Sequence, residues 1–428
     1  MGAPQHTDEA SLADYPRNFT GGLIHGVFFQ LSEAFSNINT VLPSFISTLT
    51  GSTIVIGLLV VAQQVGQIVP QMITAYHVEA RPYEKPILMW IITMRWVSWG
   101  LIALATAMFA IDQPTLVLIL LVGLFASFSM AGGVGGVVYA DVFAKAIPTE
   151  RRGRFIGWKQ LIGYLLAIGA GWVVAWILAD AERFPYPQNY AIIFGLAAVF
   201  LLVAFFGIVI VKEPPSTHER QTESFTDSLR RARHLVVINP NFRHLVTARG
   251  LTSILVMSAP FFVVFALNDI GVTPAAIGLY LAAQMTGAAL SNLVWGYLGD
   301  RFGNRAVIIG ASLTGLAAPL AALAALVVGP LPLYLTFFLV GATQSGIRLG
   351  FPNIILEMAP DHLRATCVAL LGTLLAPLAI LPLVIGIVVT WIPLSAVLVF
   401  DALALAGALV MALLLKDPRH GAEGACIT

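Results

Sequence analysis

Long apolar runs, separated by short polar segments, make up most of the chain. A helix that crosses a bilayer needs roughly 20 mainly apolar residues, and the sequence offers twelve such runs. The first six fall at about residues 20–47, 52–77, 86–111, 114–143, 153–179 and 189–211. The other six fall at about residues 246–268, 275–299, 305–328, 331–358, 364–390 and 393–415. This pattern predicts an all-α integral membrane protein with twelve transmembrane helices.

One long polar segment interrupts the pattern and divides the protein into two six-helix halves. It is too charged to cross a membrane. Within it, Ser228–Val237 is consistent with a basic amphipathic helix on the membrane surface and equally with a solvated linker. The predicted domains are a cytoplasmic tail at 1–19, a bundle at 20–211, a cytoplasmic linker at 212–245, a bundle at 246–415 and a cytoplasmic tail at 416–428.

The composition excludes several classes of protein. Hydrophobic residues make up 58% of the 428 residues and charged residues only 11%, whereas a soluble domain carries about a quarter charged residues. A net charge of +1 gives no basic field for nucleic acid. Two cysteines supply neither a disulfide framework nor a thiolate metal site. Since no nucleotide-binding, zinc-protease or hydrolase motif occurs, we expect no cofactor, no metal site and no enzyme.

The positions of Lys and Arg predict the orientation, because these residues collect on cytoplasmic loops. With the N-terminus inside, nineteen of the 23 fall on the cytoplasmic side and only Arg183 falls outside. The other three, Arg95, Arg249 and Arg348, lie within predicted helices. We expect a multi-pass protein of a bacterial inner (plasma) membrane, with both termini in the cytoplasm.

The two halves repeat each other in sequence. A shift of 221 residues places Ile56–Gly66 on Ile277–Gly287, with Gln63 on Gln284. A shift of 212 residues pairs Arg152 with Arg364. This pseudo-two-fold repeat with a polar linker is typical of carriers in which substrate binds near the midplane, between halves that rock.

A loop motif carries a resemblance to a known family. The segment Gly296–Arg305, GYLGDRFGNR, is similar to the cytoplasmic loop motif of the major facilitator superfamily. Its glycines allow a tight turn that a Cβ would strain. The resemblance covers about Asn18 to Lys416 and implies a monomeric secondary transporter that works by alternating access, with a central cavity lined by helix one and its counterparts.

The sequence departs from this family in the first half. The corresponding loop is degraded at Ala75–Lys85, where Glu79 keeps the acid but Ala75 and Pro82 replace the glycines. The helix-four arginine and helix-five G-P-x-x-G-G run of the family's proton-linked drug exporters are both absent. These departures put the first-half gate in doubt and make a drug/proton antiporter of the standard kind less favoured.

Ionisable side chains inside a bilayer are costly, so each one is a functional hypothesis. Glu33 lies near the middle of the first predicted helix, with Gln30 and Asn37 on the same helical face. A carboxylate there could bind a proton on one side of the membrane and release it on the other. The alternative is a polar contact between helices.

The family resemblance places Arg348 on a cavity-facing helix, and Arg249 and His25 at nearly corresponding places in the two halves. Together they predict a cationic inner cavity, which suits an anionic substrate or balances Glu33. The alternative for Arg249 is a side chain that extends to the membrane surface. The alternative for His25 is a hydrogen bond between helices. Gln63 and Gln284 are expected at the seam between the halves or along the cavity lining. Arg95 and Asp401 fall on helices that usually support the cavity rather than line it.

The resemblance also implies a cytoplasmic gate. We expect Asp141 and Glu357 to hold loop arginines, and Asp300 to latch against the start of helix five when the cytoplasmic side closes. The predicted gating residues are Asp300, Arg301, Arg305, Glu357, Asp141, Arg152 and Arg364.

The function expected from these features is secondary active transport of a small-molecule substrate across a lipid bilayer. An organic anion and proton symport are the finer hypotheses. A lipid or drug exporter or flippase of the same fold stays open. A membrane-embedded enzyme is disfavoured because the histidines are scattered, and a sensor because the chain shows no soluble output domain.

Overall fold

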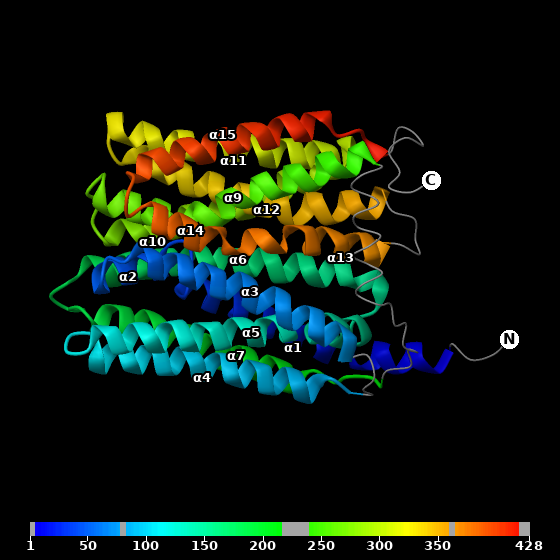
Figure 1. The fold of residues 1–428 in the computed structure, drawn as a ribbon. Helices are drawn as coiled ribbons and strands as arrows, with labels where there is room; N and C mark the ends of the chain where they lie inside the picture. Colours follow the sequence, from blue (N-terminus) through cyan, green and yellow to red (C-terminus); the bar gives the residue numbers. More distant parts are fainter. Residues whose placement is uncertain (1–4, 78–82, 216–238, 359–363, 419–428) are drawn as a thin grey trace. The chain divides into compact units, whose positions relative to one another are not determined.

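All regular secondary structure that the structure describes is helical (Figure 1). The computed structural model describes residues 5–77, 83–215, 239–358 and 364–418. Within them, ten helices are long and apolar enough to cross a membrane. Two more, α1 and α12, have spanning lengths of 31 and 28 residues but carry more polar side chains. The predicted all-α integral membrane fold, with twelve crossings in two halves, is confirmed.

The N-terminal half contains α1 (Gln5–Phe35), α2 (Val41–Leu49), α3 (Thr53–His77), α4 (Lys85–Phe109), α5 (Pro114–Ala146), α6 (Thr149–Ala179) and α7 (Gln188–Ile210). The C-terminal half contains α9 (Pro240–Asn268), α10 (Ala275–Phe302), α11 (Asn304–Val328), α12 (Leu331–Met358), α13 (Arg364–Leu375), η3 (Ala376–Ile380), α14 (Leu381–Val388) and α15 (Leu394–Leu414).

The chain forms two compact units. The first holds Met1–Asn37, Thr48–Thr50 and Leu59–Thr222, and the second holds Ile38–Ser47, Gly51–Leu58 and Glu223–Thr428. Most of α2 and the start of α3 therefore group with the second unit. There, the Thr53 hydroxyl donates to the Gly386 carbonyl of α14 at 2.8 Å.

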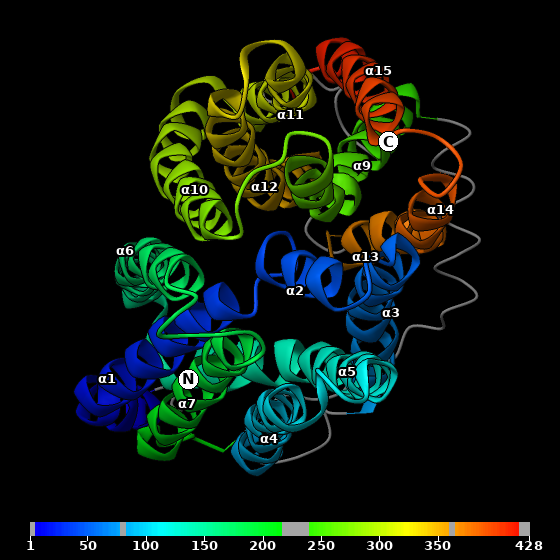
Figure 2. The ribbon, with the colours of Figure 1, turned by 90° about the vertical axis from the view of Figure 1, so that its left-hand side faces the viewer.

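In the first unit, α1 packs against α6 and α7, while α4 packs against α5 and α7 (Figure 2). Helices α3 and α5 cross closely through glycines. A Cβ on Gly66 would collide with Ser129, and a Cβ on Gly133 would collide with the backbone of Gly66 and Gln67. Small residues at such a crossing let two backbones approach, as is common between membrane helices.

The second unit repeats this arrangement. Helix α12 packs against α10 and α11, and α15 packs against α9 and α11. Helices α10 and α12 cross through Gly287, which faces the Phe338 carbonyl, and Gly341, which faces the Gln284 carbonyl. Gly66 and Gly287 are the paired ends of the sequence repeat, and each lies against the fourth crossing helix of its own unit.

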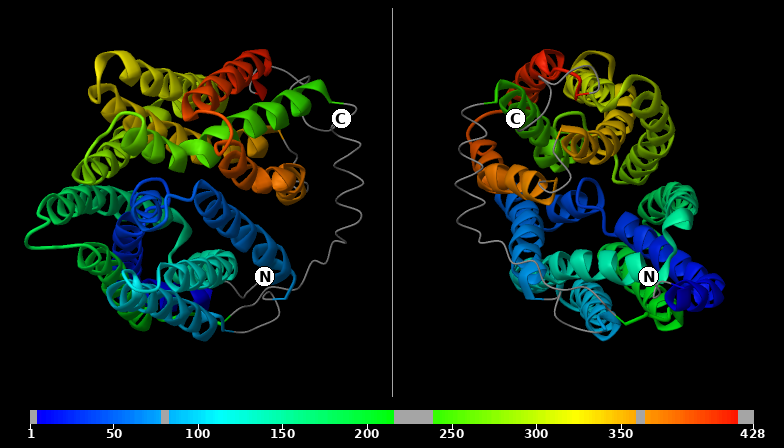
Figure 3. Two further views of the ribbon diagram at one scale, coloured as in Figure 1. Left: turned by 60° about the vertical axis from the view of Figure 1, so that its left-hand side comes forward. Right: turned by 90° about the vertical axis from the view of Figure 1, so that its right-hand side faces the viewer.

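Two crossings differ from the predicted helices. The first predicted helix, 20–47, is two helices, because α1 begins at Gln5 and ends at Phe35, and α2 starts at Val41. Asn37 consequently lies in the turn between them and not on the helical face of Glu33. The predicted helix at 364–390 is α13, η3 and α14 along one course (Figure 1, Figure 3). Its 3₁₀ segment contains Pro377, which cannot donate a helical hydrogen bond.

An asparagine ties the first helix of each unit to the segment that follows its last helix. Asn18 accepts from Lys212 N at 2.7 Å and donates to the carbonyls of Lys212 and Ala146 at 3.1 and 3.2 Å. Asn241 likewise accepts from Lys416 N at 2.8 Å and donates to its carbonyl at 3.2 Å. We call the end of each unit that carries this asparagine its basic end.

A glycine shapes the turn at the basic end of the second unit. Gly303 separates α10 from α11 with a φ of 83°, a conformation that other residues rarely adopt. The tight turn expected of the Gly296–Arg305 motif is therefore present, and Gly303 makes it. The degraded copy around Glu79, and the segment Ser228–Val237, lie outside the described residues.

Candidate functional site

The interior of the first unit contains more polar side chains than an inert helical core requires. His25, Gln30 and Glu33 lie on α1, and His25 is buried while Glu33 is exposed. Helix α4 contributes Arg95, and α6 contributes Lys159. Since each charge inside a membrane span carries a cost, the partners of these side chains decide whether they are structural or functional.

Arg95 is a buried cation held between two aromatic rings. Its guanidinium lies 4.8 Å from the Phe29 ring centroid and 4.3 Å from that of Phe128. Nε donates to the Phe128 carbonyl at 3.3 Å. Glu33 interacts with Arg95 electrostatically. Cation–π contacts of this kind stabilise a desolvated guanidinium by roughly 2 kcal/mol, so Arg95 is a fixed positive charge close to Glu33.

Lys159 is a second cation in the same interior. Its Nζ donates to the Tyr139 hydroxyl at 3.3 Å and lies 5.2 Å from the Tyr139 ring centroid. Among the described residues, no carboxylate lies within ion-pair distance of this ammonium group. A phenol is a weak partner for a full charge, so Lys159 retains the capacity to bind an anion.

His25 lies beside Tyr139 in the same interior, and a hydrogen bond fixes its tautomer. Its Nδ1 lies 3.1 Å from the Ala204 carbonyl, and because a carbonyl only accepts, Nδ1 must carry the hydrogen. The neutral ring then leaves Nε2 as an acceptor. The ring centroid lies 5.4 Å from that of Tyr139 and 5.8 Å from that of Phe29. The cluster can therefore accept a hydrogen bond at His25 Nε2 and hold an anion at Lys159.

Three glycines make room for these polar side chains. A Cβ on Gly26 would collide with Lys159, one on Gly132 with Arg95, and one on Gly163 with Gln30. Gly132 belongs to the Gly-Gly-Val-Gly-Gly run of α5, a composition that favours close packing between membrane helices. The run has two roles in the structure, since Gly133 packs against α3 while Gly132 accommodates a charge.

The interior of the second unit has its own cations. Arg249 of α9 is half-buried, binds the Ser253 hydroxyl through Nη1 and lies 5.5 Å from the Phe351 ring centroid. Arg348 of α12 is exposed. The local hydroxyl and the ring do not neutralise Arg249, so this interior is also positively charged.

The two glutamines of the sequence repeat have different surroundings. Gln284 is only 1% exposed and donates to Gln344 Oε1 of α12 at 3.3 Å. Gln63 of α3 is half-buried. The expectation that both glutamines lie at a seam between the halves, or line a cavity, stays a prediction.

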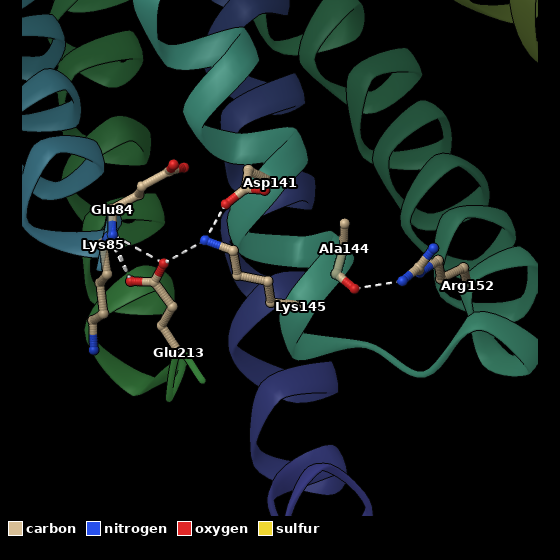
Figure 4. Close-up of polar contacts among 7 residues, drawn as sticks. All are labelled: Glu84, Lys85, Asp141, Ala144, Lys145, Arg152 and Glu213. Atoms are coloured by element: carbon tan, nitrogen blue, oxygen red, sulfur yellow. Dashed lines mark hydrogen bonds and ion pairs between the residues drawn. The ribbon is translucent and has the colours of Figure 1, made fainter. Parts of the chain in front are cut away.

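The basic end of the first unit holds a compact charged cluster (Figure 4). Both carboxylate oxygens of Glu213 accept from Glu84 N at 2.9 Å, and Oε2 also accepts from Lys85 N at 2.7 Å. Lys145 forms an ion pair with Asp141 and lies 3.5 Å from Glu213. Burial, together with the hydrogen bond to Asp141 and its charge, raises the pKa of Glu84 to about 7.

Arg152, a predicted gating residue, has a structural role at this end. Its Nε donates to the Ile147 carbonyl at 3.1 Å, and Nη2 donates to the Ala144 carbonyl (Figure 4). These are carbonyls at the C-terminal end of α5, which lack helical donors. Arg152 therefore caps α5, while Asp141 pairs with a lysine and not with the loop arginine that was expected.

The basic end of the second unit has other pairings. Glu357 accepts from Asn304 Nδ2 at 2.8 Å, and Arg305 donates to the Leu413 carbonyl at 2.9 Å. Arg301 donates to the Tyr297 hydroxyl at 2.5 Å. Asp300 is exposed. The side chain of Arg364 lies outside the described residues, and the Asp300 latch stays a prediction.

Several residues of these sites were missed or given a lesser role by reasoning from the sequence. Lys159 was counted with the cytoplasmic basic residues, and Arg95 was assigned a supporting role, but both belong to the interior of the first unit. The signal that could have found Lys159 is a helical glycine, Gly26, on the facing helix. Glu84 and Glu213 resemble ordinary loop acids in the sequence, and only the folded chain brings them together.

Comparisons with known proteins agree with the fold. The family model of the Major Facilitator Superfamily matches residues 251–425, which form most of the C-terminal half. No curated protein matches the sequence.

Solved transporter structures match the whole chain. A D-xylose-proton symporter has a TM-score of 0.68 at 15% identity, covering 97% of this chain and 99% of its own. The nucleoside transporter NupG has a TM-score of 0.66 at 14% identity, covering 93% and 98%. A bacterial homologue of the human lysosomal transporter Spinster, in an inward-facing and unoccupied conformation, has a TM-score of 0.60 at 14% identity, covering 94% and 95%.

At these identities the structural matches establish the fold, and the family match adds the class. The family match over residues 251–425 indicates a transporter and not an enzyme. Residues 251–425 match the Major Facilitator Superfamily, and nearly the whole chain has the fold of solved multi-pass transporters of low sequence identity.

Proposed function

We propose that this chain carries a small organic anion together with a proton. The observation that supports this substrate class is the excess of positive charge inside the two bundles. Arg95 and Lys159 lie in the first unit, and Arg249 and Arg348 lie in the second, whereas the carboxylates in these spans away from the basic ends are Glu33 and Asp401. An anion would offset a charge that is otherwise costly in a membrane.

Glu33 is the proposed coupling carboxylate. It is exposed, so protons can reach it, and it lies near the fixed charge of Arg95. When Glu33 loses its proton, its carboxylate balances Arg95. When it gains a proton, that positive charge becomes available to the substrate. Proton symport by a structure of the same fold, the D-xylose-proton symporter, supports this coupling. The basic ends are proposed to face the cytoplasm.

The rival proposal is a neutral polar solute, such as the nucleosides or D-xylose named for the structural neighbours. A thermal-shift series with the purified protein separates the two. Carboxylic acids are compared with their own neutral amides at two pH values. A ligand at a hundred times its Kd stabilises the protein by about 2.7 kcal/mol. Stabilisation by an acid and not by its amide supports an anion carrier, and the opposite result overturns it.

Substitutions of single cations test whether the interior side chains bind the anion. Lys159→Gln and Arg348→Ala should lose the stabilisation by the acid. Arg183→Gln removes one positive charge from the loop between α6 and α7, where Arg183 lies 5.4 Å from the Trp176 ring centroid, and should keep it. Glu33→Gln should abolish the pH dependence of uptake into proteoliposomes. Unchanged pH dependence in that variant would remove Glu33 from the mechanism.

A further inference from the structure

The basic end of the first unit contains three acids around a single ammonium group. Glu84 is 2% exposed and Glu213 is 9% exposed, and the side chain of Lys145 is 11% exposed. Lys145 interacts with Asp141 and Glu213 (Figure 4). The Asp141 side chain is 41% exposed, so the cluster reaches solvent on that side. If every acid were ionised, the three carboxylates would outnumber the Lys145 ammonium by two, which a largely buried site disfavours.

Two of the three acids have partners that suit a carboxylate. Glu213 accepts hydrogen bonds from two backbone N–H groups, those of Glu84 and Lys85, at the start of α4, where the helix dipole also favours a negative charge. Asp141 pairs with Lys145 one helical turn away. Glu84 differs from both, because its carboxyl group is buried, has one oxygen without a hydrogen-bond partner among the described residues, and interacts electrostatically with the carboxyl group of Asp141. Two carboxyl groups can share a hydrogen bond only if one of them keeps a proton.

The other charged groups around this cluster have hydrogen-bond or ion-pair partners of their own. Lys85 donates its Nζ hydrogens to the carbonyls of Val209 and Val211 at 2.9 and 2.6 Å, and its charge also acts on Glu213. Arg17 donates to the Ile210 carbonyl at 2.6 Å, and Lys212 pairs with Asp14 at 2.7 Å. Among the described residues, one carboxyl oxygen of Glu84 has no hydrogen-bond partner at all. Glu79 and Arg81, which precede Glu84 closely in the chain, lie outside the described residues.

We propose that Glu84 and Asp141 form a proton-binding site, separate from Glu33, in which one shared proton holds the start of α4 against the end of α5. The Glu84 O–H donates to an Asp141 oxygen, and Asp141 also faces the Lys145 ammonium. Loss of the proton leaves three carboxylates beside one ammonium, and repulsion then acts between these helix ends. The direction of the pKa shift at Glu84, to about 7, puts this change near neutral pH.

The second unit lacks this carboxyl pair at the corresponding place. Gly303 precedes α11 as Glu84 precedes α4, and Asp417 follows α15 as Glu213 follows α7. The end of α12 contributes Glu357, which accepts from the amide of Asn304. An amide donor suits an ionised carboxylate and requires no shared proton. Among the described residues, the proposed site therefore occurs in the first unit and not in the second, and Glu357 supplies a matched control.

Infrared difference spectroscopy of the full-length protein tests the site directly, because a protonated carboxyl group has a C=O band that a carboxylate lacks. A carboxyl band with a titration midpoint near pH 7 is expected in the parent, in Glu33→Gln and in Glu357→Gln. Asp401 is a second buried carboxyl group, so all of these proteins also carry Asp401→Asn. In that background the band should be absent in Glu84→Gln. In Asp141→Asn the midpoint should move to lower pH, because the hydrogen bond and charge that raise the pKa of Glu84 are gone.

A band that persists in Glu84→Gln, or a parent protein without any carboxyl band that titrates near pH 7, would overturn the proposal. If Glu84→Gln does not fold, the titration of the parent and of Asp141→Asn still decides the question, since an unmoved midpoint contradicts the shared proton. None of these outcomes depends on the transported solute. Failure of the anion-carrier proposal and failure of this one are therefore distinguishable.

Discussion

The basic ends of the two units have the same backbone connections and different charges. In both, an asparagine near the start of the bundle binds the lysine that follows the last helix, Asn18 with Lys212 and Asn241 with Lys416. An acid follows each lysine in the chain, Glu213 or Asp417. What differs is the residue before the third crossing helix, where one unit has a carboxyl group and the other has Gly303.

This difference separates two kinds of constraint. Backbone hydrogen bonds at a helix end must be satisfied wherever the end is buried, so both halves keep the asparagine. The side-chain charges are free to diverge, because a turn can be closed either by a glycine or by a charged cap. The repeat therefore preserves the fold, and its departures mark the places where the two units can respond differently to pH or substrate.

The largest expected effect tests the shared connection. Asn18→Ala removes three hydrogen bonds, one buried and two partly buried, and Asn241→Ala removes the two to Lys416. An unsatisfied buried group costs about 1–3 kcal/mol, so we expect losses of about 3 and about 2 kcal/mol, measured by chemical unfolding in detergent. Asn18→Asp and Asn241→Asp keep the acceptor and should lose less. A stability loss in one unit alone would contradict the equivalence of the two connections.

The second prediction compares the two interiors. Gly26→Ala should displace Lys159, whereas the matched Gly250→Ala meets Leu375 and Leu378 at ordinary contact distances of 3.4 and 3.5 Å. Overpacking costs about 1–3 kcal/mol. We expect Gly26→Ala to lower both melting temperature and anion affinity, and Gly250→Ala to leave both within error. Equal behaviour of the two variants would show that Lys159 moves aside without consequence.

The third prediction concerns pH and contrasts Glu84 with Glu357. The pKa of Glu84 is raised in the fold, so its stabilisation is fully present below about pH 4.5 and is lost as pH rises through about 7. Glu84→Gln should flatten the stability profile between these values by about 1–2 kcal/mol, a figure below the full linkage limit because solvent screens part of the effect. Glu357→Gln should leave the slope unchanged. Parallel profiles for the parent and Glu84→Gln would refute the assignment.

The sequence predicted the fold well because membrane crossing depends on run length and polarity, which are local properties. It placed most helices within a few residues, including those around the repeat from Ile56 to Gly66. It missed the break at Asn37, because the few polar residues there lie within a long apolar run and do not by themselves end a helix. Two short segments occur once in each half and were not used as a signal. They are Asn-Phe at 18–19 and 241–242, and Lys-Glu-Pro or Lys-Asp-Pro at 212–214 and 416–418. Their common role appears only when the first and last helices of a unit lie together.

The candidate site was harder to predict from the sequence than the fold, because it depends on which side chains meet. The depth of a charged residue is readable from its place in a run, and Glu33, Arg249 and Arg348 were found in that way. The partners of a charged residue depend on how the helices rotate and pack, which sequence spacing does not give. Lys159 near the start of α6 reads as a loop cation until Gly26 of α1 makes room for its side chain.

The smallest expected effect concerns the loop motif, which is intact around Asp300 and degraded around Glu79. Asp300 is proposed as a latch that favours closure of the cytoplasmic side. A partly exposed acid that meets a helix end and an arginine is worth on the order of 1 kcal/mol, about a fivefold shift between two conformations. Asp300→Asn should therefore raise the labelling rate of a cysteine introduced at Val246, one turn from Arg249, after Cys367 and Cys426 are replaced by serine. Glu79→Gln in the degraded copy should raise it less, because Pro82 and Ala75 have already replaced the glycines of the motif. Equal labelling in Asp300→Asn and the parent, at equal expression, would mean that the loop after α10 is only a turn.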